Sequence, residues 1–261
     1  MIPELPPPPG APAHHGPRDL PAVRWGPWEA ITVFFLGNIV IAQVVVGSVV
    51  LALMGVGSGE PIEGLPQIMA TVAADVAFLG AMLLWLTWKA RDWRRRVGLT
   101  FGATAVRDAA VGFGLGALLY FVVAVVVAVP LLSVFRRLFG AGVSPPEQIP
   151  GSLSINAKII TAFLALVLAP VTEELFYRGI FYRSLRDRHG VLVGAAVSSL
   201  LFGASHVVSA PWRDVVFLQT LMVFTGVGLA LIYERRANLV ADIAAHMAFN
   251  VIGIVIIFGT H

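Results

Sequence analysis

The chain has no cysteine and few charged residues, and both shortages limit what it can be. Without cysteine it can form no disulfide, use no thiol nucleophile and offer no thiolate ligand to a metal. Only 13% of its 261 residues are charged, 57% are hydrophobic, and the mean hydropathy is +0.84. A soluble globule of this length needs more polar surface. The composition therefore predicts a protein whose main solvent is lipid.

Basic residues are present, but they do not form a basic face. The net charge is +3 and the pI is near 9.7, yet the arginines stand in short clusters between apolar stretches, as orientation signals of membrane proteins do. We therefore expect no nucleic acid partner. The excess of Arg over Lys, together with abundant Ala, Gly and Val, is typical of a GC-rich bacterium. The expected location is a bacterial plasma membrane, crossed several times.

Apolar stretches long enough to cross a hydrocarbon core recur along the chain. They cover residues 30–54, 66–88, 109–132, 157–177, 190–210, 214–232 and 238–259. The predicted fold class is all-α, a polytopic transmembrane bundle of about seven helices. Residues 1–27 are rich in proline and have no apolar run, so we expect a disordered cytoplasmic tail before a transmembrane domain over 28–261. Most Lys and Arg residues then face the tail's side, which predicts the N-terminus inside and the C-terminus outside.

Ionisable and amide side chains within these stretches are the candidate functional residues, because such groups are costly in hydrocarbon. They are Asp75, Glu173, Glu174, Arg178, His206, Asp242, His246 and Asn250. Glu174 and Arg178 are four residues apart with the acid first, which predicts an ion pair within one helix. Asp75 has no ionic partner that the sequence identifies. Structural pairing is its simplest interpretation, and a functional role remains the alternative.

Glu173 points about 100° away from Glu174 on a helix, so it needs a different partner, and His206 could be that partner. If the fourth and fifth helices turn near Gly190, Glu173 and His206 both lie roughly 24 Å from the turn at 1.5 Å per residue. The two side chains would then be level. This requires the fourth helix to continue through the arginine-rich segment to about Asp187.

The last apolar stretch carries a second polar group. His246 and Asn250 are at i and i+4 and project from one face, with Asp242 one turn earlier on the same stripe. Counted from a turn near Arg236, His246 lies roughly 15 Å along its helix. Helix tilt, or a turn at a different depth, could close the remaining difference in depth from Glu173.

Proline and glycine within the apolar stretches have structural interpretations. Pro170 in the fourth stretch predicts a kink and freed backbone groups that neighbouring helices must satisfy. The glycines at 112, 114, 116, 226 and 228 are expected to allow close helix packing, because no strand precedes them as a nucleotide loop would require.

The polar set permits two kinds of hydrolytic chemistry. A carboxylate beside an imidazole can deprotonate a water, while a second imidazole and an amide can donate hydrogen bonds to an oxyanion. Alternatively, Glu173, His206 and His246 could be the ligands of a zinc ion with an open coordination position. The cofactor prediction is therefore none or zinc. The sequence has no His-Glu-x-x-His, Gly-x-Ser-x-Gly or Gly-x-Gly-Asp motif.

Three short motifs resemble those of one family. They are Glu173-Glu174-Leu-Phe-Tyr-Arg178 (Glu-Glu-x-x-x-Arg), Phe202-Gly-Ala-Ser-His206 (Phe-x-x-x-His) and His246-Met-Ala-Phe-Asn250 (His-x-x-x-Asn). In this order they resemble the CPBP (Abi) family, which includes the type II CAAX prenyl endopeptidases. The resemblance covers about residues 155–255.

This resemblance implies an intramembrane endopeptidase acting on membrane-associated or CAAX-like peptides and proteins. It implies that Glu173 and His206 activate water, that His246 and Asn250 form an oxyanion hole, and that Glu174 and Arg178 support the site. Two other classes remain as alternatives. One is a non-proteolytic membrane scaffold, accessory or bacteriocin-immunity protein, and the other is a transporter that uses Asp75 and the histidines as a proton relay.

Overall fold

A computed structural model describes residues 20–57, 59, 62–146 and 153–259, and all structural statements below refer to these residues. They are helical and include no strand. Several long helices change from α-helical to π-helical hydrogen bonding (η) along their length. The elements are α1 (Pro27–Thr32), η1 (Val33–Gly47), α2 (Ser48–Leu53), α3 (Gly64–Lys89), α4 (Trp93–Arg96), α5 (Ala105–Phe121), η2 (Val122–Ala128), α6 (Val129–Phe139), α7 (Ile155–Phe163), η3 (Leu164–Leu168), α8 (Ala169–Glu174), η4 (Leu175–Tyr182), α9 (Arg183–Ala204), α10 (Trp212–Arg236) and α11 (Leu239–Gly259).

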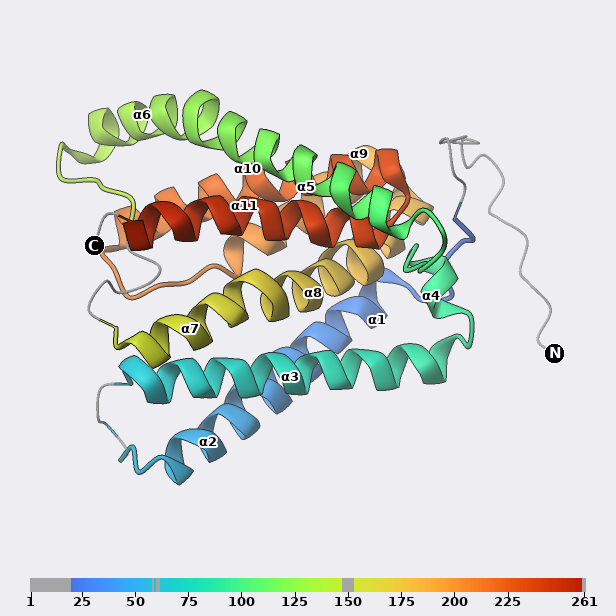
Figure 1. Cartoon of the computed structure of the whole chain (residues 1–261), viewed down its shortest axis with the longest axis horizontal. Helices are drawn as coiled ribbons and strands as arrows, with labels where there is room; N and C mark the ends of the chain where they lie inside the picture. Colours follow the sequence, from blue (N-terminus) through green and yellow to red (C-terminus); the bar gives the residue numbers. More distant parts are fainter. Residues whose placement is uncertain (1–19, 58, 60–61, 147–152, 260–261) are drawn as a thin grey trace.

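These elements join into seven long helices that run roughly side by side, with the short α4 at one end of the bundle (Figure 1). Six continuous helical segments are long and apolar enough to cross a membrane. One of them, Ile155–Ala204, contains two of the predicted helices, because Gly190 has non-helical angles (φ 86°, ψ 171°) and bends the chain there. The predicted all-α transmembrane bundle of about seven helices is confirmed. The orientation of the termini remains a prediction.

The fourth helix has the length that the sequence argument required. It runs from Ile155 through η3, α8 and η4 into α9, and it passes Asp187 before the bend at Gly190. Every residue of η4 is buried, so this part of the helix, Arg178 included, lies in the protein interior, whereas Arg188 near the end of the helix is exposed. The helix thereby presents Glu173 and Glu174 in the middle of the bundle.

The predicted fifth helix, 190–210, is wrong at its end. It stops at Ala204, so the part after the bend is shorter than the about 20 residues that a membrane crossing needs. His206 lies in the connection that follows, and its Nδ1 is 2.7 Å from the carbonyl oxygen of Phe202 in the last turn. A histidine that binds a last-turn carbonyl helps to end a helix. The residues beyond it, such as the exposed Val207, are also apolar, so the hydropathy pattern does not show where the helix ends.

The end of the predicted flexible tail packs against the bundle. Residues 1–19 lie outside the described residues, but Trp25 is completely buried and its indole N–H donates to the carbonyl of Ile180 at 3.0 Å. The backbone N–H of Val23 donates to Asp187 at 2.9 Å, and Arg183 donates to the carbonyl of Pro21 at 2.9 Å. Residues 20–26 therefore form an extended strap across η4 and α9, which corrects the expectation of disorder up to residue 27.

The closest contact between two long helices joins α5 to α11. A Cβ added at Gly112 would lie 2.0 Å from the carbonyl oxygen of Ala241, and one at Gly116 would lie 1.9 Å from that of Ala245. Only glycine fits at either position. Gly114, which faces open space, makes no such contact. The expected close packing is thus confirmed at residues 112 and 116 and is wrong at residue 114.

We expect Gly116→Ala to push α11 away from α5, because its methyl group would overlap the Ala245 carbonyl. Overpacking of this kind costs about 1–3 kcal/mol. The midpoint of thermal unfolding in detergent should fall for Gly116→Ala and stay unchanged for Gly114→Ala, the matched control. Equal midpoints for the two variants would contradict the proposed close contact.

Candidate active site

A completely buried carboxylate, Glu174, stands at the centre of the polar cluster. Its Oε1 accepts hydrogen bonds from Nη1 of Arg178 at 3.0 Å and from Nδ1 of His246 at 2.7 Å. Nη2 of Arg178 donates to the carbonyl of Gly226 on α10 at 3.2 Å, and its guanidinium lies 4.7 Å from the ring centroid of Phe202. The predicted ion pair between Glu174 and Arg178 is present. Glu174 of this pair also binds His246, a contact that the sequence did not predict.

His246 connects the two glutamates. Because its Nδ1 donates to Glu174, its Nε2 is left free to face Glu173, whose Oε2 is 3.8 Å away. The Glu173 side chain is 29% exposed, whereas that of His246 is 6% exposed. Glu173 is thus the most exposed member of this group. The partner of Glu173 in the structure is His246, which corrects the expected pairing with His206.

The depth counted from the sequence placed His246 shallower than Glu173, with helix tilt or a turn at a different depth as the ways to bring them together. The two meet because α10 ends level with η4, where the hydroxyl of Tyr182 donates to Glu234 at 2.6 Å. Glu174 is eight residues before Tyr182, and His246 is eight residues after Asn238 at the α10–α11 turn. The arginine-rich end of the fourth helix extends past this turn, which accounts for the apparent difference in depth.

His206 joins the cluster through an aromatic ring. The rings of His206 and Phe202 have centroids 4.6 Å apart, and those of Phe202 and His246 have centroids 6.0 Å apart. Among the described residues, His206 forms no hydrogen bond or ion pair with Glu173. Its Nδ1 is occupied by the Phe202 carbonyl, so Nε2 is the nitrogen that remains for a substrate or water.

Asn250 binds a backbone carbonyl that Pro170 leaves without a partner inside its own helix. Its amide nitrogen donates to the carbonyl of Ala165 at 2.8 Å. Ala165 lies in the π-helical part η3, where a carbonyl bonds to the N–H five residues later, and residue 170 is a proline without an N–H. The expectation that a neighbouring helix must satisfy a carbonyl freed by Pro170 is thereby confirmed. Asn250 uses one of its two amide hydrogens for this bond.

Asp242, whose role the sequence left open, lies against Glu174. It is completely buried, and its carboxyl group interacts with that of Glu174. Neither carboxylate can donate a hydrogen bond, so both oxygens of Asp242 and Oε2 of Glu174 have no donor among the described residues. A single proton shared between the two acids would satisfy one oxygen of each. Asp242 then acts as a donor that holds Glu174 in place.

Asp242→Asn should therefore be tolerated better than Asp242→Leu. The amide keeps an N–H for Oε2 of Glu174, whereas leucine leaves that buried oxygen unpaired, at a cost of about 1–3 kcal/mol. The midpoints of thermal unfolding in detergent should follow the order wild type, Asp242→Asn, Asp242→Leu. If the asparagine variant were as unstable as the leucine variant, Asp242 would not be the donor.

Asp75 also reaches this region. It lies on α3, partly buried, and its carboxyl group interacts electrostatically with that of Glu173. The structure thus gives Asp75 an interaction with Glu173 that sequence counting did not find, because α3 and α8 are distant in sequence and their relative register depends on tertiary packing.

The three proposed zinc ligands, Glu173, His206 and His246, are not grouped as a metal site in the structure. Within the described part of the chain, no three His, Cys, Asp or Glu side chains are grouped so that they could hold a metal ion.

Comparisons with known proteins agree with the three motifs. Residues 155–252 match the family described as Type II CAAX prenyl endopeptidase Rce1-like. This part of the chain is similar to that family, in agreement with the resemblance predicted from the sequence. The match begins at the first residue of α7 and includes every residue of the polar cluster except Asp75.

One curated relative is an "Uncharacterized 24.3 kDa protein" from Escherichia coli, which is 29% identical over 103 residues. The similar stretch covers 39% of this chain and 46% of that relative, so it spans about half of the relative's length. No solved structure matches the chain.

Proposed function

We propose that this protein is an intramembrane endopeptidase that cleaves membrane-associated or CAAX-like peptides with a water activated by Glu173. The observation that carries the proposal is the line of contacts from Arg178 through Glu174 to His246 and on to Glu173. Three of these side chains are buried and fix one another, while the Glu173 side chain is partly exposed. The Rce1-like match supports the peptidase class, because that family is named for its endopeptidases.

In this proposal Glu173 takes a proton from a water, and the resulting hydroxide attacks the carbonyl carbon of the peptide bond. His246 faces the same space, and its protonated form, stabilised by Glu174, donates from Nε2 to the oxyanion. Asn250 and Nε2 of His206 are the further candidates for contact with the substrate. When the tetrahedral intermediate collapses, the C–N bond breaks and Glu173 returns its proton to the leaving amine.

Glu173→Gln should abolish cleavage of a membrane-bound reporter peptide while leaving the fold intact. The amide cannot accept the proton, and loss of a general base lowers the rate by about 100-fold or more. Glu63→Gln, the same change at an exposed residue just before α3, should cleave at the wild-type rate. Unchanged cleavage by Glu173→Gln, at an unchanged unfolding midpoint, would contradict the proposed role of Glu173.

The same variant separates the peptidase from the alternatives. A scaffold or immunity protein would keep its cellular function after Glu173→Gln, because that function does not need a base. A transporter would show flux in proteoliposomes that depends on Asp75. Lost cleavage without either behaviour supports the peptidase.

We further propose that catalysis does not pass through a zinc ion. The cleavage rate should then be unchanged after prolonged treatment with a zinc chelator and dialysis. A rate that falls with the chelator and returns when Zn²⁺ is added would favour the alternative in which Glu173, His206 and His246 bind a metal.

A further inference from the structure

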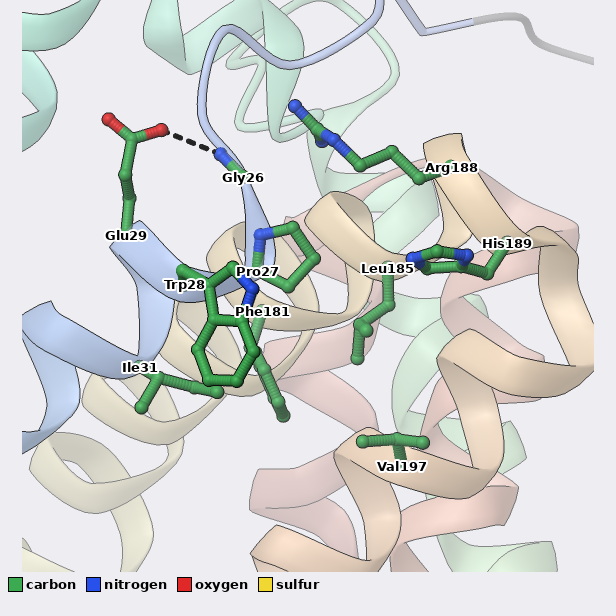
Figure 2. A pocket seen from close by; sticks show the side chains of 10 residues that line it. All are labelled: Gly26, Pro27, Trp28, Glu29, Ile31, Phe181, Leu185, Arg188, His189 and Val197. Carbon is green, nitrogen blue, oxygen red and sulfur yellow. Dashed lines mark hydrogen bonds between the residues drawn. The ribbon is translucent and has the colours of Figure 1, made fainter.

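A cavity outside the polar cluster opens between the start of α1 and the bend of α9 (Figure 2). Its volume is about 590 Å³, within the range of about 300–1,000 Å³ that is common for small-molecule sites. Apolar side chains form its floor, and two basic ones stand at its rim. The floor is formed by Ile31, Phe181, Leu185 and Val197, and the rim by Arg188 and His189.

The charge of Arg188 is only partly balanced by the protein, because Glu29 interacts with it electrostatically without forming an ion pair. Its Nη1 donates to two neutral carbonyl oxygens, those of Trp25 at 2.9 Å and Ser184 at 3.1 Å. Among the residues that the structure describes, no carboxylate forms an ion pair with it. Glu29, the acid that also lines the cavity, is bound to Lys89 and to the backbone N–H of Gly26 instead. The exposed guanidinium therefore retains hydrogens for an anion.

The position of the cavity along the bundle matches the membrane surface. Trp28 in its wall is 81% exposed and Trp88, at the end of α3, is 80% exposed. Exposed tryptophans are typical of the interface between hydrocarbon and headgroups. The start of α1, the end of α3 and the short α4 lie at the same end of the bundle (Figure 1). The basic rim of the cavity is thus at headgroup depth, and its apolar floor faces the acyl chains.

From this arrangement we infer that the cavity binds one anionic phospholipid. The phosphate contacts Arg188 and His189, and the start of an acyl chain lies on the apolar floor. A second apolar cavity of about 400 Å³ lies on the other side of Trp28, lined by Val33, Leu36 and Ile41. The site uses none of the residues proposed for catalysis, so it is independent of the peptidase activity.

The test measures lipid binding to the delipidated full-length protein in detergent by native mass spectrometry. The probes are dioctanoyl phosphatidylglycerol, dioctanoyl phosphatidylcholine and glycerol 3-phosphate, the last representing a phosphate without acyl chains. Wild type should prefer the anionic lipid, and glycerol 3-phosphate should not displace it. Arg188→Gln should weaken binding of phosphatidylglycerol by about 10-fold or more, because a charge-assisted bond is lost, and should remove the preference.

Two further variants make the test decisive. Arg95→Gln removes the same charge from an exposed residue at the same end of the bundle and should keep the preference. Val197→Trp fills the cavity from a partly exposed position and should weaken binding of both lipids. The proposal is overturned if Arg95→Gln weakens binding as much as Arg188→Gln, if neither cavity variant has an effect, or if glycerol 3-phosphate competes as well as the lipid.

Discussion

The structure depends on a buried negative charge, the carboxylate of Glu174. A carboxylate in the centre of an apolar bundle is stable only when enough donors surround it. Here the donors come from the same helix, through Arg178, and from α11, through His246, while Arg178 also reaches the backbone of α10. One charge therefore fixes the relative positions of three helices. It also occupies Nδ1 of His246, and so leaves Nε2 to face Glu173.

Close packing keeps α11 at the distance that this charge requires. Lipid offers no hydrophobic force to press helices together, so association relies on shape and on polar contacts. Gly112 and Gly116 let the backbone of α11 approach α5 closely, next to the alanines at 241 and 245. His246 follows directly after the second alanine. The glycines, which have no side-chain chemistry, thus position a residue of the candidate site.

Much of the fold followed from the sequence, because each helix must satisfy its own backbone in lipid and shows this as an apolar run. The turn assumed near Gly190 is present in the structure, and helix geometry gave the pair of Glu174 and Arg178. What failed depended on contacts between distant segments. His206 lies past a helix end that apolar residues conceal, and Glu173 faces His246 because of the register between α8 and α11. Such registers are set by packing and leave no periodic signal.

The strap at residues 20–26 has a consequence for how the protein assembles. Trp25 occupies a place formed by Ile180, which is 155 residues later in the chain. A ribosome makes the first helix long before the fourth, so during synthesis the first helix enters the membrane without its final neighbour. Until the fourth helix is present, the first helix lies in the membrane without this contact, and the indole N–H of Trp25 bonds to water or headgroups. Docking of the chain's beginning therefore follows insertion of the fourth helix, and the candidate site is complete only after α11, which carries His246, has joined it.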